Sequence, residues 1–168
     1  MAEIKLQNLS KRWGNFVAVE NFNLTIADEE FVVLLGPSGC GKTTTMRMIA
    51  GLEDATEGDI LVDGNRINDL EPKDRDVAMV FQSYALYPHL TVRRNLETPL
   101  RLRDYSSLER FPLLGNLFPN KKNKTKKIND LVQKTSETLK ITELLDRKPG
   151  QLSGGQRQRA ALGRAMVR

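Results

Sequence analysis

The fold of this chain follows from one stretch of sequence, Gly36-Pro37-Ser38-Gly39-Cys40-Gly41-Lys42-Thr43-Thr44. The apolar run Phe31–Leu35 precedes it, and its β-branched and aliphatic residues, ended by Gly-Pro, indicate a buried strand. A helical pattern opens directly after it. A Gly-x-x-x-x-Gly-Lys-Thr loop between a strand and a helix predicts a phosphate-binding loop, rather than a Gly-rich turn with an incidental Lys-Thr pair.

Each part of this loop suits the chemistry of an anion. Glycines let the backbone turn its N–H groups inward, where residues with a Cβ atom would crowd the turn. The helix that opens near Lys42 would direct the positive end of its dipole at the anion. In such loops the lysine reaches the outer phosphates and the following hydroxyl, here Thr43, ligates Mg²⁺.

Length and composition limit the possible size, redox environment and location of the protein. With 168 residues the chain is long enough for one domain with a real core, or for most of one. The single cysteine, Cys40, rules out an internal disulfide and fits a reducing cytoplasm. No apolar run approaches the length that spans a bilayer, and the first residues show no secretory pattern. We expect a cytoplasmic chain, or one that reaches a membrane through a partner.

The positive charge is local. The whole chain carries +5, whereas the region from Arg101 to Lys134 alone holds nine Lys and Arg against three Asp and Glu. This distribution argues against a nucleic-acid-binding face spread over the chain. Residues 101–127, with a broken apolar pattern and the charge run Asn120–Lys127, indicate an insertion. An exposed flexible loop is the preferred interpretation, and a patch that touches anionic lipid is the alternative.

Further elements follow from periodicity. Asp63-Gly64 is a turn signal, which disfavours Asp63 as a magnesium ligand at a strand end. The predicted strands are 3–9, Val17–Ile26, Gly58–Asp63 and Asp76–Phe81, and the predicted helical segments are Thr44–Leu52, Ile128–Leu145 and one that follows Ser153.

Three features outside the phosphate loop are candidates for function. The only tryptophan, Trp13, lies on a predicted turn, where it either stacks on a purine or caps the edge of a sheet. The aromatic and apolar segment Tyr84–Leu90 is either core or a partner surface. Ser153-Gly154-Gly155-Gln156 opens a helix and forms a second anion-binding terminus.

These motifs together resemble a known family. The chain resembles the nucleotide-binding subunit of ATP-binding cassette (ABC) transporters in three motifs, Gly36–Thr43, Phe81-Gln82 and Leu152–Gln156. The resemblance extends from Ile4 to Arg164 and is weak only across 101–127. The sequence around these motifs resembles that of the ATPase of sugar importers of the maltose type. The resemblance implies an α/β P-loop NTPase fold with a small antiparallel β subdomain and a helical subdomain, incomplete at the C-terminus. It places the β subdomain and phosphate-loop core in residues 1–82 and the helical subdomain in 83–168.

The resemblance also implies roles for single residues, with ATP and Mg²⁺ as cofactors. Trp13 matches the aromatic that stacks on adenine, and Gln82 matches the glutamine that meets Mg²⁺ and the attacking water. Ser153 to Gln156 match the signature that closes on the γ-phosphate of the opposite chain in a head-to-tail dimer. Tyr84–Leu90 resembles the groove that receives a permease subunit, so the chain would lie on the inner face of the cell membrane and bind no nucleic acid.

In this family an apolar strand with a magnesium-binding Asp and a catalytic Glu follows the signature helix, and a switch His comes later. No such strand is found between Met1 and Arg168, and the only histidine, His89, lies beside the partner groove. We expect ATP binding without efficient hydrolysis, and an apolar run Phe31–Leu35 that lacks its family neighbours. A soluble ABC ATPase outside transport and a non-catalytic nucleotide-binding remnant are the alternative functions.

Overall fold

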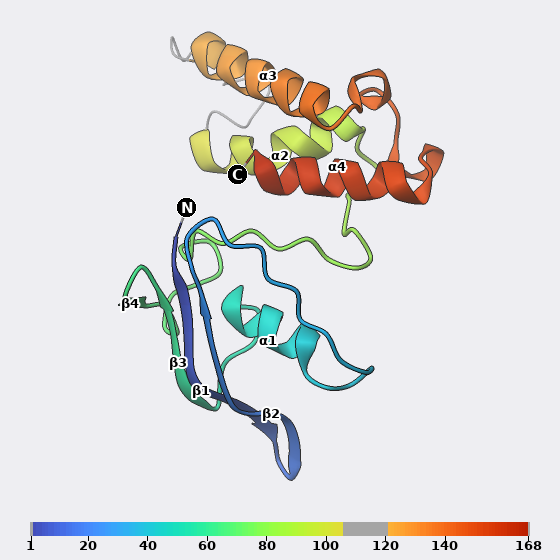
Figure 1. Ribbon diagram of the computed structural model, residues 1–168. Coiled ribbons are helices and arrows are strands. Elements are labelled where there is room, and N and C mark those ends of the chain that lie inside the picture. Colours follow the sequence, from blue (N-terminus) through green and yellow to red (C-terminus); the bar gives the residue numbers. More distant parts are fainter. Residues whose placement is uncertain (1, 106–120, 168) are drawn as a thin grey trace. The chain divides into compact units, whose positions relative to one another are not determined.

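The computed structural model describes residues 2–105 and 121–167. The chain divides into two compact units, Met1–Val77 and Ala78–Arg168. The first contains all the strands of the described residues and one helix, and the second is helical (Figure 1).

The first unit is built on a four-stranded antiparallel sheet with the order β2-β1-β3-β4. The strands are β1 (Ile4–Trp13), β2 (Phe16–Ile26), β3 (Glu57–Val62) and β4 (Asn65–Arg66). Asp63-Gly64 joins β3 to β4, and both residues have positive φ, as a tight hairpin turn requires. The predicted turn is therefore confirmed, and the Asp63 carboxylate accepts a hydrogen bond from the Glu3 amide at 2.8 Å, next to the start of β1.

Helix α1 (Lys42–Ile49) lies beside this sheet (Figure 1). It ends three residues before the predicted Leu52, because Gly51 adopts a left-handed conformation (φ +73°) that favours glycine. Met48 of α1 is fully buried among apolar side chains of the sheet. The core of this unit consists of Leu6, Leu9, Val19, Met48, Ile60 and Ile67.

The run Phe31–Leu35 does not form the predicted strand. It has no regular secondary structure, and Phe31 and Leu35 are 89% and 87% exposed. A strand forms its hydrogen bonds with neighbours, and no strand of the described residues pairs with this run. The prediction of a buried strand was therefore wrong here. Asp76–Phe81, also predicted as a strand, likewise has no regular structure.

The second unit packs three helices, α2 (Val92–Asp104), α3 (Lys121–Thr138) and α4 (Gly154–Met166). Two short 3₁₀ helices, η2 (Thr142–Leu144) and η3 (Pro149–Gln151), connect α3 to α4. The buried core is Val92, Leu96, Leu100, Tyr105, Ile128, Val132, Ile141, Leu144, Leu145, Leu152, Ala160 and Val167. The predicted helix Ile128–Leu145 is continuous to Thr138, where a turn with Lys140 at φ +53° ends it.

The prediction of a flexible loop over 101–127 is wrong at both ends. Residues 101–104 complete α2, and Lys121–Lys127 form the first two turns of α3. Lysine is a good helix former, so a lysine run does not by itself indicate a loop. Tyr105 is buried, and its hydroxyl lies 2.8 Å from that of Thr125. The remaining part, 106–120, lies outside the described residues. Within the described part of the chain, no helix is long and apolar enough to cross a membrane.

Candidate phosphate-binding site

The backbone of the predicted phosphate loop depends on its glycines. Gly39 and Gly41 have φ of +84° and +90°, which L-residues rarely adopt. A Cβ atom on Gly41 would lie 2.4 Å from the Ala18 carbonyl oxygen of β2, and one on Gly36 would lie 2.5 Å from Cys40 Sγ. The loop therefore packs directly against β2 at one point and closes on itself at the other, which leaves no room for side chains.

Lys42, the first residue of α1, turns its side chain back over this loop. Its Nζ donates hydrogen bonds to the carbonyls of Gly36 and Pro37, each at 2.7 Å, and lies 3.3 Å from Cys40 Sγ. The ammonium is thus held at the N-terminal end of α1, where the helix dipole and the first N–H groups are also positive. An anion bound at this loop would contact both the Lys42 ammonium and the N–H groups of the first turn of α1.

A cavity of about 260 Å³ lies beside the loop, entirely within the first unit. Thr45 lines it and donates its hydroxyl to the Gly41 carbonyl, so that hydroxyl is occupied. Thr43 is exposed, which keeps it suited to a metal ligand. The cavity is lined by Ala18, Val19, Glu20, Phe22, Leu34, Leu35, Cys40, Gly41, Lys42 and Thr45.

These residues fit a bound polyphosphate. The loop is so closely wound that a Cβ on Gly36 would clash with Cys40 Sγ, and this turn lies next to the Lys42 ammonium. Charge-assisted hydrogen bonds from lysine and backbone N–H groups are the strong contacts that phosphate oxygens accept.

Trp13 is the last residue of β1, and the turn follows it at Gly14 and Asn15, so the prediction that Trp13 lies on a turn was wrong. It is 45% exposed, and its ring stacks on Phe16 with centroids 6.2 Å apart. Lys11 Nζ lies 5.1 Å from the Trp13 ring and 2.7 Å from the Glu53 carboxylate. The hydrogen bond from Lys11 lowers the pKa of Glu53. Trp13 does not line the cavity at the loop, but its exposure leaves ring surface on which a planar base can stack.

The predicted signature lies at the start of α4 in the second unit. Ser153 caps the helix: its hydroxyl accepts from the Gln156 amide at 3.3 Å, and the Ser153 amide donates to the Gln156 side chain at 2.8 Å. This reciprocal pair is a capping box, which fixes where the helix begins. Gly154 and Gly155 are exposed, so another molecule can approach the first turn closely.

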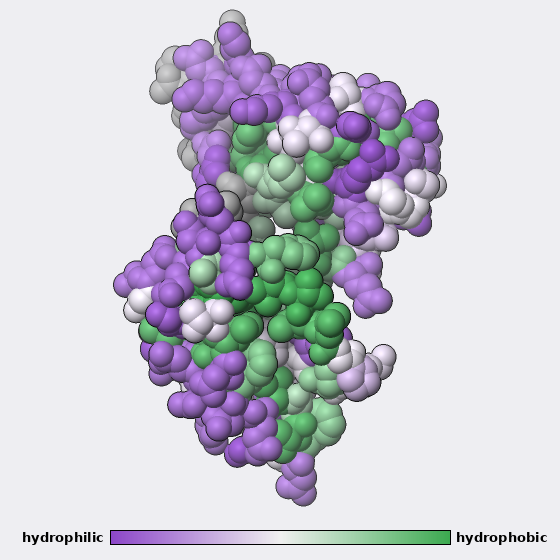
Figure 2. Space-filling view, viewed as in Figure 1, coloured by the Kyte–Doolittle hydropathy of each residue, from purple (hydrophilic) through white to green (hydrophobic). Residues whose placement is uncertain are grey.

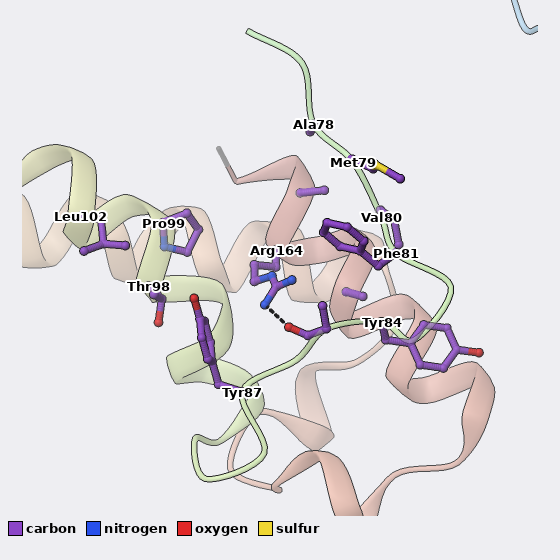
Figure 3. A pocket seen from close by; sticks show the side chains of 13 residues that line it. Ala78, Met79, Val80, Phe81, Tyr84, Tyr87, Thr98, Pro99, Leu102 and Arg164 are labelled. Atoms are coloured by element: carbon purple, nitrogen blue, oxygen red, sulfur yellow. Dashed lines mark hydrogen bonds between the residues drawn. The ribbon is translucent and has the colours of Figure 1, made fainter. Parts of the chain in front are cut away.

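Gln82 is exposed in a turn of the second unit, and the segment Tyr84–Leu90 follows it. Next to this segment lies a cavity of about 350 Å³, lined from α2, α4 and residues 78–87 (Figure 3). Asn95 and Arg164 hold the segment in place, and sequence reasoning missed both. Asn95 had a signal: it is a polar residue within the apolar stripe of α2 that includes Val92, Leu96 and Leu100.

Solved structures identify the architecture. The dimeric structure of MJ0796, a bacterial ABC transporter cassette, aligns with a TM-score of 0.78 and 32% identity and covers 98% of this chain and 69% of that one. A nucleotide-free ATP-binding cassette from an ABC transporter gives 0.79 at 27% identity and covers 99% and 65%. The fold is that of an ATP-binding cassette, a class of P-loop NTPase, in a shorter chain than these cassettes. The predicted fold class is confirmed.

Sequence relatives identify the family. Residues 19–168 match the ABC transporter family, and the chain belongs to that family. The trehalose import ATP-binding protein SugC of Mycobacterium tuberculosis is 55% identical over 172 residues, covering 100% of this chain and 38% of the relative. The multiple sugar-binding transport ATP-binding protein MsmK of Streptococcus mutans is 48% identical, covering 100% and 40%. The chain thus spans about two fifths of the length of these relatives, and the resemblance to ATP-binding subunits of sugar importers is confirmed.

Proposed function

We propose that this chain binds ATP at the loop Gly36–Thr44 and serves as the energy-coupling subunit of an importer for sugars or related small solutes. The observation that carries the proposal is the Lys42 ammonium, held over the loop by the Gly36 and Pro37 carbonyls at the start of α1. The likeness to relatives named for trehalose and multiple-sugar transport supports the solute class.

In this proposal the loop amides and Lys42 hold the phosphates, and Trp13 stacks on the adenine. Thr43 of the first unit and Gln82 of the second would each offer a side-chain oxygen to Mg²⁺, which when bound neutralises charge on the phosphate oxygens. Gln82 also orients the attacking water. The exposure of Thr43, Gln82 and Trp13 supports these roles, because each side chain is accessible to a ligand.

Partners follow from the same proposal. Ser153 to Gln156 would meet the γ-phosphate bound by a second nucleotide-binding subunit in a head-to-tail dimer. The segment Tyr84–Leu90 would receive a permease subunit, which places the chain in the cytoplasm on the inner face of the cell membrane. The exposed glycines at the start of α4 and the aromatic side chains beside the 350 Å³ cavity support these two surfaces. Residues 1–82 would carry the nucleotide and 83–168 the partner contacts.

We further propose that these residues bind ATP but hydrolyse it slowly. Phosphoryl transfer to water requires a group that orients or deprotonates the water, and a general base typically contributes on the order of 10²–10⁴-fold. Glu20 is the carboxylate that lines the cavity at the loop, and it is paired with Arg12 at 3.4 Å. The Glu20 carboxylate is thus held by a guanidinium on the sheet rather than by the loop.

The proposal is tested by equilibrium ATP binding to the wild-type chain and to Lys42→Ala. Loss of a charge-assisted contact should weaken binding by about 1.5–3 kcal/mol, or roughly 10- to 100-fold. Lys5→Ala is the matched control, because Lys5 pairs with Glu3 on the sheet surface. Equal affinity in Lys42→Ala and wild type would refute the site.

Hydrolysis is tested by steady-state phosphate release, with Lys42→Ala as the control for contaminating ATPases. We expect turnover close to background. Robust turnover that Lys42→Ala abolishes would show that a carboxylate of this chain acts as the base. Glu20→Gln would then be the first variant to measure, because Glu20 lines the cavity.

A further inference from the structure

The segment that follows Gln82 contains a strained kink. Tyr84 and Ala85 are consecutive and have φ of +63° and +47°, the left-handed conformation that L-residues rarely adopt. The Tyr84 amide donates to the Phe81 carbonyl at 2.8 Å, which closes a tight turn at the kink. Such a conformation persists only where the surroundings hold it, and it is found most often at sites where a protein switches or binds.

Arg164 of α4 holds this kink from the side (Figure 3). Its Nη1 donates to the Ala85 carbonyl at 2.7 Å, and its guanidinium carbon lies 5.5 Å from the centre of the Tyr87 ring. A hydrogen bond from a charged donor is about twice as strong as a neutral one, and the cation–π contact adds to it. Two contacts from one side chain thus fix both the backbone and the side chain of the segment.

The other end of the segment is fixed independently by α2. Asn95 is fully buried, and its side-chain oxygen accepts from the Tyr87 amide at 2.8 Å. Its side-chain nitrogen lies within hydrogen-bond distance of the Tyr87 and Leu90 carbonyls, each at 3.2 Å. The segment is therefore anchored from Tyr87 onward, and the strained residues before Tyr87 depend on Arg164.

The kink also has room to relax. Tyr84 and Ala85 border the cavity of about 350 Å³, together with Phe81, Leu102 and Arg164 (Figure 3). Well-packed interiors resist rearrangement, whereas an open cavity beside a strained turn permits a second conformation.

We propose that Arg164 is a positioning residue: it holds the kink at Tyr84–Ala85 and so ties the segment Tyr84–Leu90 to α4, the helix that begins at Ser153. The inference rests on the proposed function, in which that segment meets the permease and Ser153 meets nucleotide. A displacement of α4 that withdraws Arg164 releases the kink, and the partner surface changes shape. Arg164 thereby links the two surfaces through one guanidinium.

The test is amide hydrogen exchange of the full chain, followed in peptides that cover 84–91 and, as a reference, 128–138 of α3. Protected amides in the first peptide include those of Tyr84, Tyr87 and Leu90. Arg164→Met should raise exchange in 84–91 by about tenfold or more at the Tyr84 amide, as loss of a hydrogen bond from a charged donor does, and leave the Tyr87 amide, which Asn95 holds, protected. The reference peptide should not change.

Arg159→Met is the matched control, because Arg159 also lies on α4 but donates to the carbonyls of Leu139 and Lys140. It should leave 84–91 unchanged. No effect of Arg164→Met on 84–91, or an equal rise in 128–138, would overturn the proposal, since Arg164 would then be irrelevant to the kink or only a general stabiliser of the unit.

A double-mutant cycle separates holding the kink from simple packing. Glycine adopts positive φ without strain, so an Ala85→Gly background removes the strain at position 85 and leaves only that at Tyr84 to be held. Arg164→Met should then raise exchange in 84–91 by a clearly smaller factor than in wild type. An equal factor in both backgrounds would overturn the proposal. Neither nucleotide nor permease enters this experiment, so its failure is distinct from a failure of ATP binding, which Lys42→Ala reports.

Discussion

The two units of this chain differ in how fully they bury their apolar side chains. In the second unit, side chains such as Leu96 and Val132 are fully buried between helices. In the first unit, the apolar run Phe31–Leu35 is largely exposed, and Figure 2 shows hydrophobic residues gathered on the visible face of that unit. The difference follows from hydrogen bonding, because a helix satisfies its own backbone whereas a strand relies on neighbours.

The phosphate loop is held by contacts within its own unit, although the run Phe31–Leu35 before it has no regular structure. Its shape depends on Gly41 against β2, on Lys42 over the loop, and on α1, whose Met48 is buried in the core of the unit. All of these contacts lie within the first unit. A binding site can therefore be formed locally next to an unpaired apolar segment.

The largest effect should come from core truncation. Leu96→Ala removes a fully buried side chain of α2 and should lower the free energy of unfolding by about 2–5 kcal/mol. Phe31→Ala, at an 89% exposed position, should change it by no more than about 0.5 kcal/mol. Denaturant unfolding of both variants measures the contrast. A cost for Phe31→Ala as large as that for Leu96→Ala would mean that the run is buried, and the comparison would fail.

Arg75 offers a second test, within the first unit. Its guanidinium is buried and donates to the carbonyls of Met48, Asn68 and Leu70 at 2.7–2.9 Å. Burial lowers the pKa of Arg75, as expected for a charge removed from water. Arg75→Met should leave these carbonyls unsatisfied and cost about 1–3 kcal/mol.

The readout for Arg75→Met is exchange protection, which should fall in α1 and β3 and stay unchanged in α3. An equal loss of protection in both units would show that they do not unfold separately, and the comparison between the two units would then fail.

A smaller effect should come from the junction of α2 and α3. Tyr105→Phe removes a hydroxyl that lies 2.8 Å from the Thr125 hydroxyl and should cost roughly 0.5–1.5 kcal/mol. Thr138→Val is the control, because the Thr138 hydroxyl donates only to the Lys134 carbonyl of its own helix. A thermal melt suffices to compare them. No loss in Tyr105→Phe would favour the exposed-loop interpretation of the lysine run.

Sequence reasoning succeeded where structure is set locally. The Asp63-Gly64 turn and the start of the helix after Ser153 depend on residues adjacent in sequence, and both are confirmed. It failed for Phe31–Leu35, because a strand depends on partners distant in sequence. It also missed Arg164, whose tertiary hydrogen bond no local pattern indicates, and Asn95, whose signal was its polar side chain within the apolar stripe of α2. The binding roles of Trp13, Gln82 and the signature remain predictions.

The smallest effect concerns pH near Trp13. The hydrogen bond from Lys11 lowers the pKa of Glu53 in the folded state. The ionised pair therefore stabilises the folded state above the pKa that Glu53 has in the unfolded state, and this stabilisation is lost as pH falls through the pKa of Glu53 in the folded state. Trp13 fluorescence should therefore change with a midpoint below the usual glutamate value of about 4.3. Glu53→Gln should abolish this transition, whereas Glu57→Gln, which affects a pair with Arg12, should retain it. A transition that persists in Glu53→Gln would assign it to another group.

The most direct test of the central claim, that the local loop of the first unit binds ATP, is amide exchange with and without ATP and Mg²⁺. We predict that ATP slows exchange in residues 36–45 and leaves 128–138 of α3 unchanged, and that Lys42→Ala removes the protection of 36–45. The absence of any protection in 36–45, or the same protection in Lys42→Ala as in wild type, would contradict the account.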